Sequence, residues 1–119
     1  MVSVCDRDEE RCAEARERLP GARSYTDLEQ MLDECALDVL IVATPPSAHL
    51  DAIRAALPRG VHVVCEKPLG ITHDDLAELR ALTEAHPDAT LATVLQYHHA
   101  PAWQEIAQRL DQPIASRMH

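Results

Sequence analysis

A charged pair follows an apolar run near the middle of the chain. Glu66 and Lys67 come directly after V-H-V-V-C at 61–65, and Pro68 closes the motif. A lysine ammonium at the end of a strand can hydrogen-bond a substrate hydroxyl, stabilise a developing alkoxide and orient a cofactor. Pro68 removes a backbone donor and fixes the chain there, and Glu66 could hold the lysine. Taken alone, an E-K-P tripeptide is usually just a turn.

A second set of polar residues follows another apolar run, in A-T-P-P-S-A-H at 43–49. Thr44 and Pro45 lie at the expected strand end, and His49 falls in the first turn of the next expected helix. A helix N-terminus disfavours a protonated imidazole, which suits a neutral hydrogen-bonding contact near a cofactor. A surface histidine explains this stretch equally well, so both readings of His49 stay open here.

Asp6 and Arg7 follow the first apolar run, V-S-V-C at 2–5. A carboxylate in this place can accept hydrogen bonds from a ribose diol, and it would repel a 2′-phosphate. Arg7 could stack on adenine or pair with a 2′-phosphate, so the two residues favour NAD over NADP only slightly. A helix-start or surface carboxylate is the competing interpretation of Asp6.

Alternating strands and helices must position these residues. Apolar runs predict strands at 2–5, 38–43, 61–65 and 90–97, and helical patterns predict helices at 8–19, 26–35, 47–57, 72–85 and 101–110. Asp8 is the expected N-cap of the first helix, and Thr26 with Glu29 forms an expected capping box at the second. Unbroken Val/Ile/Leu strands between helices predict an α/β fold with a parallel sheet covered on both faces.

In such a sheet, ligands bind at the carboxyl ends of the strands. One rim would therefore carry four segments: 6–7, 44–46, 66–68 and 96–98. Gln96 in the last segment is an expected cofactor contact. No metal site is expected, because His98 and His99 are adjacent on a predicted strand and would point to opposite faces.

Composition predicts a single domain over residues 1–119, without a repeat or linker. A formal net charge of −9 argues against a nucleic-acid or anionic-membrane partner. The longest apolar run, near 39–43, is too short to span a membrane, and no signal-peptide pattern opens the chain. Four cysteines without a C-x-x-C pair fit small buried residues in a reducing cytosol. We expect a cytoplasmic domain, and a homo-oligomer is left open.

Three stretches together resemble the glucose–fructose oxidoreductase/inositol 2-dehydrogenase (Gfo/Idh/MocA) family. They are YTDLEQML at 25–32, LDVLIVATPPSAHLDAIRAALPRGVHVVCEKPLGIT at 37–72 and PAWQEIAQRL at 101–110. The family's T-P-x-x-x-H and G-[KV]-H-V-x-x-E-K-P motifs stand at this separation, and the resemblance covers about residues 2–110. It implies a Rossmann-like, doubly wound NAD(P)-binding domain.

The resemblance also implies a reaction, in which hydride passes between nicotinamide and a carbinol carbon of a sugar, polyol or related carbonyl compound. By carry-over, Lys67 is the catalytic residue that contacts the reacting hydroxyl, while Glu66 and Pro68 shape the nicotinamide pocket. The remaining implied contacts are those of Thr44, Pro45 and His49 along the cofactor and of Asp6 with the ribose.

The sequence departs from the family pattern in several places. The family's first strand and its G-x-G-x-x-G turn, which holds a pyrophosphate at a helix N-terminus, find no match. No substrate domain is recognised, and H-H-A-P at 98–101 stands where the family often has R-F-x-P. In the doubly wound order the first strand is central, so its absence would leave two apolar edges facing an empty slot or force them to pair. We therefore expect an incomplete fragment with weak or no dehydrogenase activity alone.

Two other classes compete with this interpretation. A non-catalytic, Rossmann-like binding module would keep the shape without turnover, as loss of the glycine-rich turn suggests. A phosphoacceptor receiver domain shares the length and the parallel layout, but it needs an aspartate at the end of a middle strand. That strand ends I-V-A-T-P-P here, which makes the receiver the weaker alternative.

Overall fold

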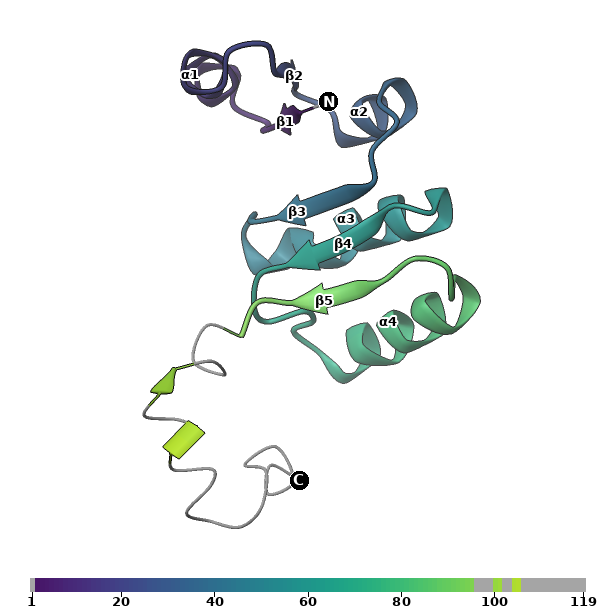
Figure 1. Cartoon of the computed structure of the whole chain (residues 1–119). Coiled ribbons are helices and arrows are strands. Elements are labelled where there is room, and N and C mark those ends of the chain that lie inside the picture. Colours follow the sequence, from purple (N-terminus) through teal and green to yellow (C-terminus); the bar gives the residue numbers. More distant parts are fainter. Residues whose placement is uncertain (1, 96–99, 102–103, 106–119) are drawn as a thin grey trace.

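The computed structural model describes residues 2–95, 100–101 and 104–105 (Figure 1). Its elements in chain order are β1 (Ser3–Cys5), α1 (Glu9–Arg18), β2 (Arg23–Tyr25), α2 (Leu28–Glu34), β3 (Val39–Val42), η1 (Pro46–Ala48), α3 (His49–Ala56), η2 (Leu57–Arg59), β4 (His62–Cys65), α4 (His73–Ala85) and β5 (Leu91–Thr93), where η marks a 3-10 helix.

The described strands form two parallel sheets. One contains β1 and β2, and the other contains β3, β4 and β5 in that order. The predicted α/β class with parallel strands is therefore confirmed. The sequence did not predict β2, because R-S-Y at 23–25 lacks the apolar run that marked the other strands. The predicted strand at 90–97 ends at Thr93, and most of the predicted helix at 101–110 lies outside the described residues.

Polar caps fix where the helices begin. Asp8 caps α1 as predicted, and its side chain accepts a hydrogen bond from the backbone N–H of Glu10 at 2.9 Å. The capping box predicted for Thr26 is wrong, because Asp27 caps α2 and accepts from the N–H of Gln30 at 2.8 Å. A carboxylate one residue later competes successfully for the same free N–H groups.

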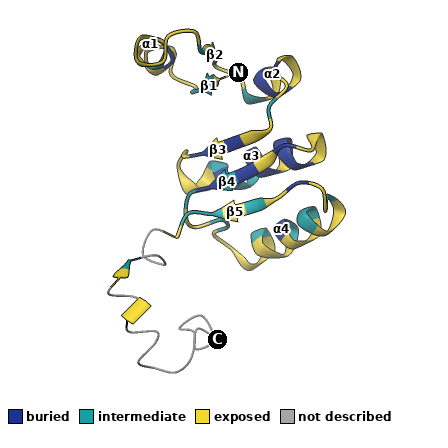
Figure 2. Ribbon diagram, viewed as in Figure 1, coloured by how far each residue is buried: buried dark blue, intermediate teal, exposed yellow. Residues whose placement is uncertain are grey.

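Helix α3 lies at the centre of the hydrophobic core. It packs on β3 and β4, with α2 and α4 on either side. Ile53 of α3, Leu57 of η2 and Val63 and Cys65 of β4 have no exposed surface. Figure 2 shows the buried residues gathered along α3 and the strands against it. This layer holds the carboxyl ends of β3 and β4 in place.

Helix α2 connects this core to the smaller sheet, since it contacts β1 and β2 as well as α3. The Tyr25 hydroxyl donates to Glu34 Oε2 at 3.2 Å, and Ser3 Oγ lies 3.2 Å from Cys35 Sγ. All four cysteines are free thiols, three of them buried, in line with the predicted structural role. No described helix is long and apolar enough to cross a membrane.

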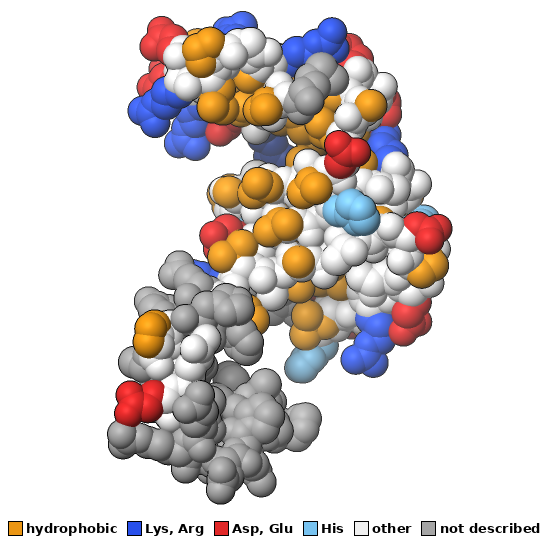
Figure 3. Space-filling model, viewed as in Figure 1, with side chains coloured by type: hydrophobic (Ala, Val, Ile, Leu, Met, Phe, Trp, Pro, Cys, Tyr) orange, Lys and Arg blue, Asp and Glu red, His pale blue; other side chains and the backbone are white. Residues whose placement is uncertain are grey.

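The two sheets do not join, because no hydrogen-bonded ladder links β1 with β3. This is the slot that the doubly wound order predicted. On β3, Val39 and Ile41 are 48% and 73% exposed. Ile41 pairs with Val64 of β4, and Val64 pairs with Ala92 of β5. We call these four residues the open face; Figure 3 shows hydrophobic side chains gathered over it.

The core and the open face allow a matched test of packing. Ile53→Ala should lower the free energy of unfolding by about 2–5 kcal/mol, because it leaves a cavity in the packed core. Ile41→Ala removes the same atoms from an exposed position and should change it by about 0.5 kcal/mol or less. Urea unfolding followed by circular dichroism measures both, and equal losses would contradict this placement of the core.

Candidate functional site

Two turns leave the larger sheet side by side, at the carboxyl ends of β3 and β4. Val42 and Cys65 pair in register, so the residues that follow each of them emerge at the same edge. The backbone N–H of Glu66 also donates to the Val42 carbonyl at 2.9 Å, which extends the pairing into the E-K-P motif. Parallel pairing thus places the Thr44 turn beside the Lys67 turn.

Lys67 is exposed at this edge, while Glu66 is half-buried. The Glu66 carboxylate accepts a hydrogen bond from the backbone N–H of Lys67 at 3.3 Å, so it contacts the lysine through the main chain. Within the described part of the chain, the Lys67 ammonium has no ion-pair partner. It is therefore available to a hydroxyl group or to a cofactor. The Lys67–Pro68 peptide bond is cis.

His49 lies behind both turns and is only 1% exposed. Its Nε2 is 2.8 Å from the Thr44 carbonyl oxygen, and its Nδ1 is 2.8 Å from the Pro68 carbonyl oxygen. The surface-histidine interpretation is therefore wrong. The side chain connects the two motifs that the sequence could only place near each other.

Asp6 and Arg7 follow β1 and so belong to the smaller sheet. One Asp6 oxygen, Oδ1, accepts from the backbone N–H of Asp8 at 2.9 Å, and Oδ2 lies 3.7 Å from Arg11 Nη1. The carboxylate therefore does help to start α1, as the competing interpretation held. Its side chain is still 35% exposed, which leaves room for a ligand.

The structure separates the predicted site residues into two groups. One edge of the larger sheet carries Thr44, Pro45, His49, Glu66, Lys67 and Pro68. The end of β1 carries Asp6 and Arg7, and Gln96 lies outside the described residues. The described residues contain no group of three potential metal ligands, and His98 and His99 also lie outside them.

Sequence reasoning missed the residues that hold the exit of the E-K-P turn. Asp75 Oδ2 accepts from the backbone N–H groups of Ile71 and Thr72 at 2.7 and 3.0 Å, and the Thr72 hydroxyl accepts from the N–H of Asp75. A Cβ at Gly70 would lie 2.8 Å from the Asp75 Cβ, so the close approach requires glycine there. The T-x-x-D spacing at 72–75 was the available signal.

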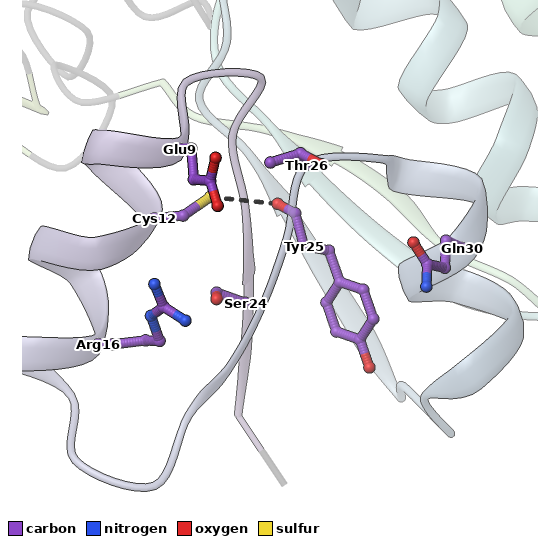
Figure 4. A pocket seen from close by; sticks show the side chains of 7 residues that line it. All are labelled: Glu9, Cys12, Arg16, Ser24, Tyr25, Thr26 and Gln30. Atoms are coloured by element: carbon purple, nitrogen blue, oxygen red, sulfur yellow. Dashed lines mark hydrogen bonds between the residues drawn. The ribbon is translucent and has the colours of Figure 1, made fainter.

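A hollow of about 240 Å³ lies elsewhere, beside β2 on the smaller sheet (Figure 4). The Cys12 thiol at its back donates to the Tyr25 carbonyl at 3.2 Å, while Glu9 and Arg16 line its rim with opposite charges. None of the predicted site residues lines it. The hollow is shallow and has no group that the E-K-P chemistry needs, so we do not assign the site to it.

Comparison with known proteins identifies the family. The model of the oxidoreductase family with an NAD-binding Rossmann fold (GFO_IDH_MocA) matches residues 1–94. The chain belongs to this family. The predicted Gfo/Idh/MocA resemblance is thus confirmed, and the receiver-domain interpretation is excluded.

Several relatives in this family are named dehydrogenases. D-xylose 1-dehydrogenase (NADP(+)) 2 of Haloferax volcanii is 31% identical over 90% of this chain and 33% of its own length. Inositol 2-dehydrogenase 4 of Saccharopolyspora erythraea is 35% identical over 69% of this chain and 24% of its own. The Bordetella pertussis WlbA dehydrogenase, solved with NADH and UDP-GlcNAcA, superimposes with a TM-score of 0.86 at 26% identity, over 93% of this chain and 32% of that one. The chain spans about a third or less of these proteins.

The Gfo/Idh/MocA residues present here fit part of a dinucleotide. Asp6 offers carboxylate oxygens for a ribose, and Lys67 offers an ammonium at the other group of residues. The three glycines do not form a phosphate-binding turn: Gly21 and Gly60 have positive φ angles just after α1 and η2, and Gly70 packs against α4. A pyrophosphate cradle is therefore not formed by the described elements.

Hydrogen bonds from the N–H groups of Ile71 and Thr72 lower the pKa of Asp75. Because its pKa is lowered, the Asp75 carboxylate stabilises the fold at pH values above its ordinary pKa of 3.8. This stabilisation is lost as the pH falls below that value. Asp75→Asn should therefore flatten the dependence of stability on pH in the acid range below pH 4, in urea melts at several pH values. Asp74→Asn, next to it, is the control. An unchanged acid slope in Asp75→Asn would show that these hydrogen bonds do not matter.

Proposed function

We propose that this chain forms the nicotinamide-side part of an NAD(P)-dependent sugar or polyol dehydrogenase, with Lys67 as the catalytic residue. Family membership supports the oxidoreductase class. The observation that carries the finer proposal is the pairing of the two motif turns at one sheet edge, with the Lys67 ammonium exposed and unpaired there among the described residues.

Lys67 has the right chemistry to handle a hydroxyl that loses or gains hydride. The bound nicotinamide supplies the hydride acceptor or donor. The lysine ammonium donates a hydrogen bond to the reacting oxygen and stabilises negative charge as the proton leaves it. Glu66 and Pro68 shape the pocket around Lys67, because a backbone contact and a proline fix the turn on both sides of it.

The remaining proposed contacts lie along the cofactor. Thr44 and Pro45 line it at the end of β3, and Asp6 takes the ribose diol at the end of β1. Arg7 is exposed beside Asp6 and can stack on the adenine. Because the Asp6 carboxylate repels a 2′-phosphate, NAD is slightly favoured over NADP. Gln96, outside the described residues, completes the proposed contacts.

The substrate class follows from the relatives, whose names specify D-xylose and inositol. We propose a sugar, polyol or related carbonyl compound for this chain. By itself the chain should act weakly or not at all, because the described elements offer no pyrophosphate cradle and the slot separates the two groups of site residues. The alternative is a non-catalytic, Rossmann-like binding module.

Cofactor binding is the first test. Isothermal titration of the purified chain with NADH should show binding weaker than micromolar, and Asp6→Asn should weaken it by about tenfold or more, because a charged acceptor is lost. Asparagine keeps the oxygen that accepts from the Asp8 N–H, so the start of α1 should survive. The same variant should lose any preference for NADH over NADPH.

Asp88→Asn is the matched control, since Asp88 is exposed in the turn before β5, at the opposite end of the strand from the site. It should bind NADH like the unchanged chain. Failure of millimolar NADH to bind at all would remove the proposed function. Micromolar binding by a stable monomer would instead overturn the expectation of an incomplete fragment.

Turnover tests the role of Lys67. With NAD and a panel of inositols and aldoses, any NADH formed by the chain should fall by about 10²–10⁴-fold in Lys67→Met, because the hydrogen bond to the reacting oxygen is lost. Binding of NADH should change little. Arg80→Met removes a charge from the exposed side of α4 and serves as the control. Equal turnover in Lys67→Met would rule out Lys67 as the catalytic residue.

A further inference from the structure

His49 faces two acceptors at once. The carbonyl oxygens of Thr44 and Pro68 lie 2.8 Å from its two ring nitrogens, and a carbonyl oxygen can only accept a hydrogen bond. A neutral imidazole carries one N–H, so its other nitrogen would direct a lone pair at a carbonyl lone pair. Only the imidazolium, with a proton on each nitrogen, makes both contacts hydrogen bonds.

Two terms oppose a charge at His49: burial and the helix N-terminus. The effect of the helix N-terminus is weakened by η1, which precedes α3 and continues into it. The backbone N–H of His49 already donates to the Pro46 carbonyl, so the free N–H groups of this helical stretch lie a turn earlier. The effect of a helix end falls off within its first turn. Two charge-assisted hydrogen bonds act against the cost of burial, because such bonds are about twice as strong as neutral ones.

The charged groups on the elements around α3 are mostly engaged with one another. Arg59 pairs with Glu29 and Asp33 of α2 at 2.6 and 2.8 Å, and Arg54 pairs with Asp51 and with Glu78 of α4, both at 2.7 Å. On the E-K-P turn itself, Glu66 and Lys67 carry opposite charges. No described arginine or lysine forms a hydrogen bond with the imidazole.

We propose that His49 is a positioning residue that acts as an imidazolium and ties the Thr44 turn to the Pro68 turn. This rests on the proposed function, in which Thr44 lines the cofactor and Lys67 contacts the reacting hydroxyl. Lys67 immediately precedes Pro68, so anchoring the Pro68 carbonyl limits the movement of the lysine relative to Thr44. His49 itself is buried and reaches the cofactor only through the two turns.

The protonation state can be read directly in the full chain. Long-range proton–nitrogen spectra of ¹⁵N-histidine-labelled protein at pH 7.5, where an unperturbed histidine is mostly neutral, separate N–H nitrogens from bare ones. Both His49 nitrogens should carry protons. His62 is an internal control, because its Nδ1 accepts from the Thr90 N–H at 2.9 Å and must be bare. One bare nitrogen on His49 would overturn the proposal.

The positioning role has its own readout. The two N–H donors of glutamine lie on one nitrogen, so in His49→Gln they cannot replace donors on the two sides of a ring. In this variant ¹⁵N relaxation should show the order parameters of Lys67 and Leu69 falling from about 0.85 to below about 0.6. Val63, whose N–H donates to the Thr90 carbonyl at 2.8 Å inside the sheet, should stay rigid. Loss of order at Val63 as well, or at none of them, would contradict a positioning role.

These two readouts are independent of catalysis. If His49→Gln fails to fold, the nitrogen spectra of the unchanged chain still decide the protonation state. If NADH does not bind, the proposed function fails, while both readouts keep their expected values because neither uses the cofactor. Failure of the spectra with normal NADH binding would remove only the role of His49.

Discussion

The parallel pairing of β3 with β4 is the constraint on which the rest of the candidate site depends. It brings together two short motifs that are twenty or so residues apart in the sequence, because strands that run in the same direction end at the same edge. α3 then contributes twice. Its apolar side, with Ile53, packs the strands together, and its first residue, His49, bonds the turns that leave them. Core and site are therefore held by the same helix.

The smaller sheet depends on different interactions. It holds Asp6 at the end of β1, but no ladder connects it to β3. Its attachment to the core runs through α2, where Tyr25 and Cys35 form polar contacts with Glu34 and Ser3. A hydrogen bond from Ser3 lowers the pKa of the Cys35 thiol, which marks this junction as polar. The ribose side and the nicotinamide side of the proposed site are thus carried by parts with unequal support.

Much of this arrangement could be predicted from residue patterns. The apolar runs located β1, β3 and β4, and the doubly wound order predicted the slot between β1 and β3. Three features could not be predicted in this way. β2 is held by pairing with β1 and not by its own apolar content, so R-S-Y gave no periodic signal. The choice of Asp27 over Thr26 as a cap depends on backbone geometry. The burial of His49 arises from two carbonyls that meet only in the folded chain.

The division into two sheets has a consequence for how the molecule opens. Local unfolding follows cooperative units, and units with few buried contacts open at the lowest free energy. Of the described residues in the β1–α1–β2 unit only Cys12 and Tyr25 are buried, and Tyr25 belongs to the hydrophobic cluster of the unit around α3, which has most of the buried side chains. The β1–α1–β2 unit should therefore unfold locally while the unit around α3 stays folded. A dinucleotide that bound Asp6 at one end and Lys67 at the other would link the two units. Its binding would therefore make local unfolding of the β1–α1–β2 unit less frequent.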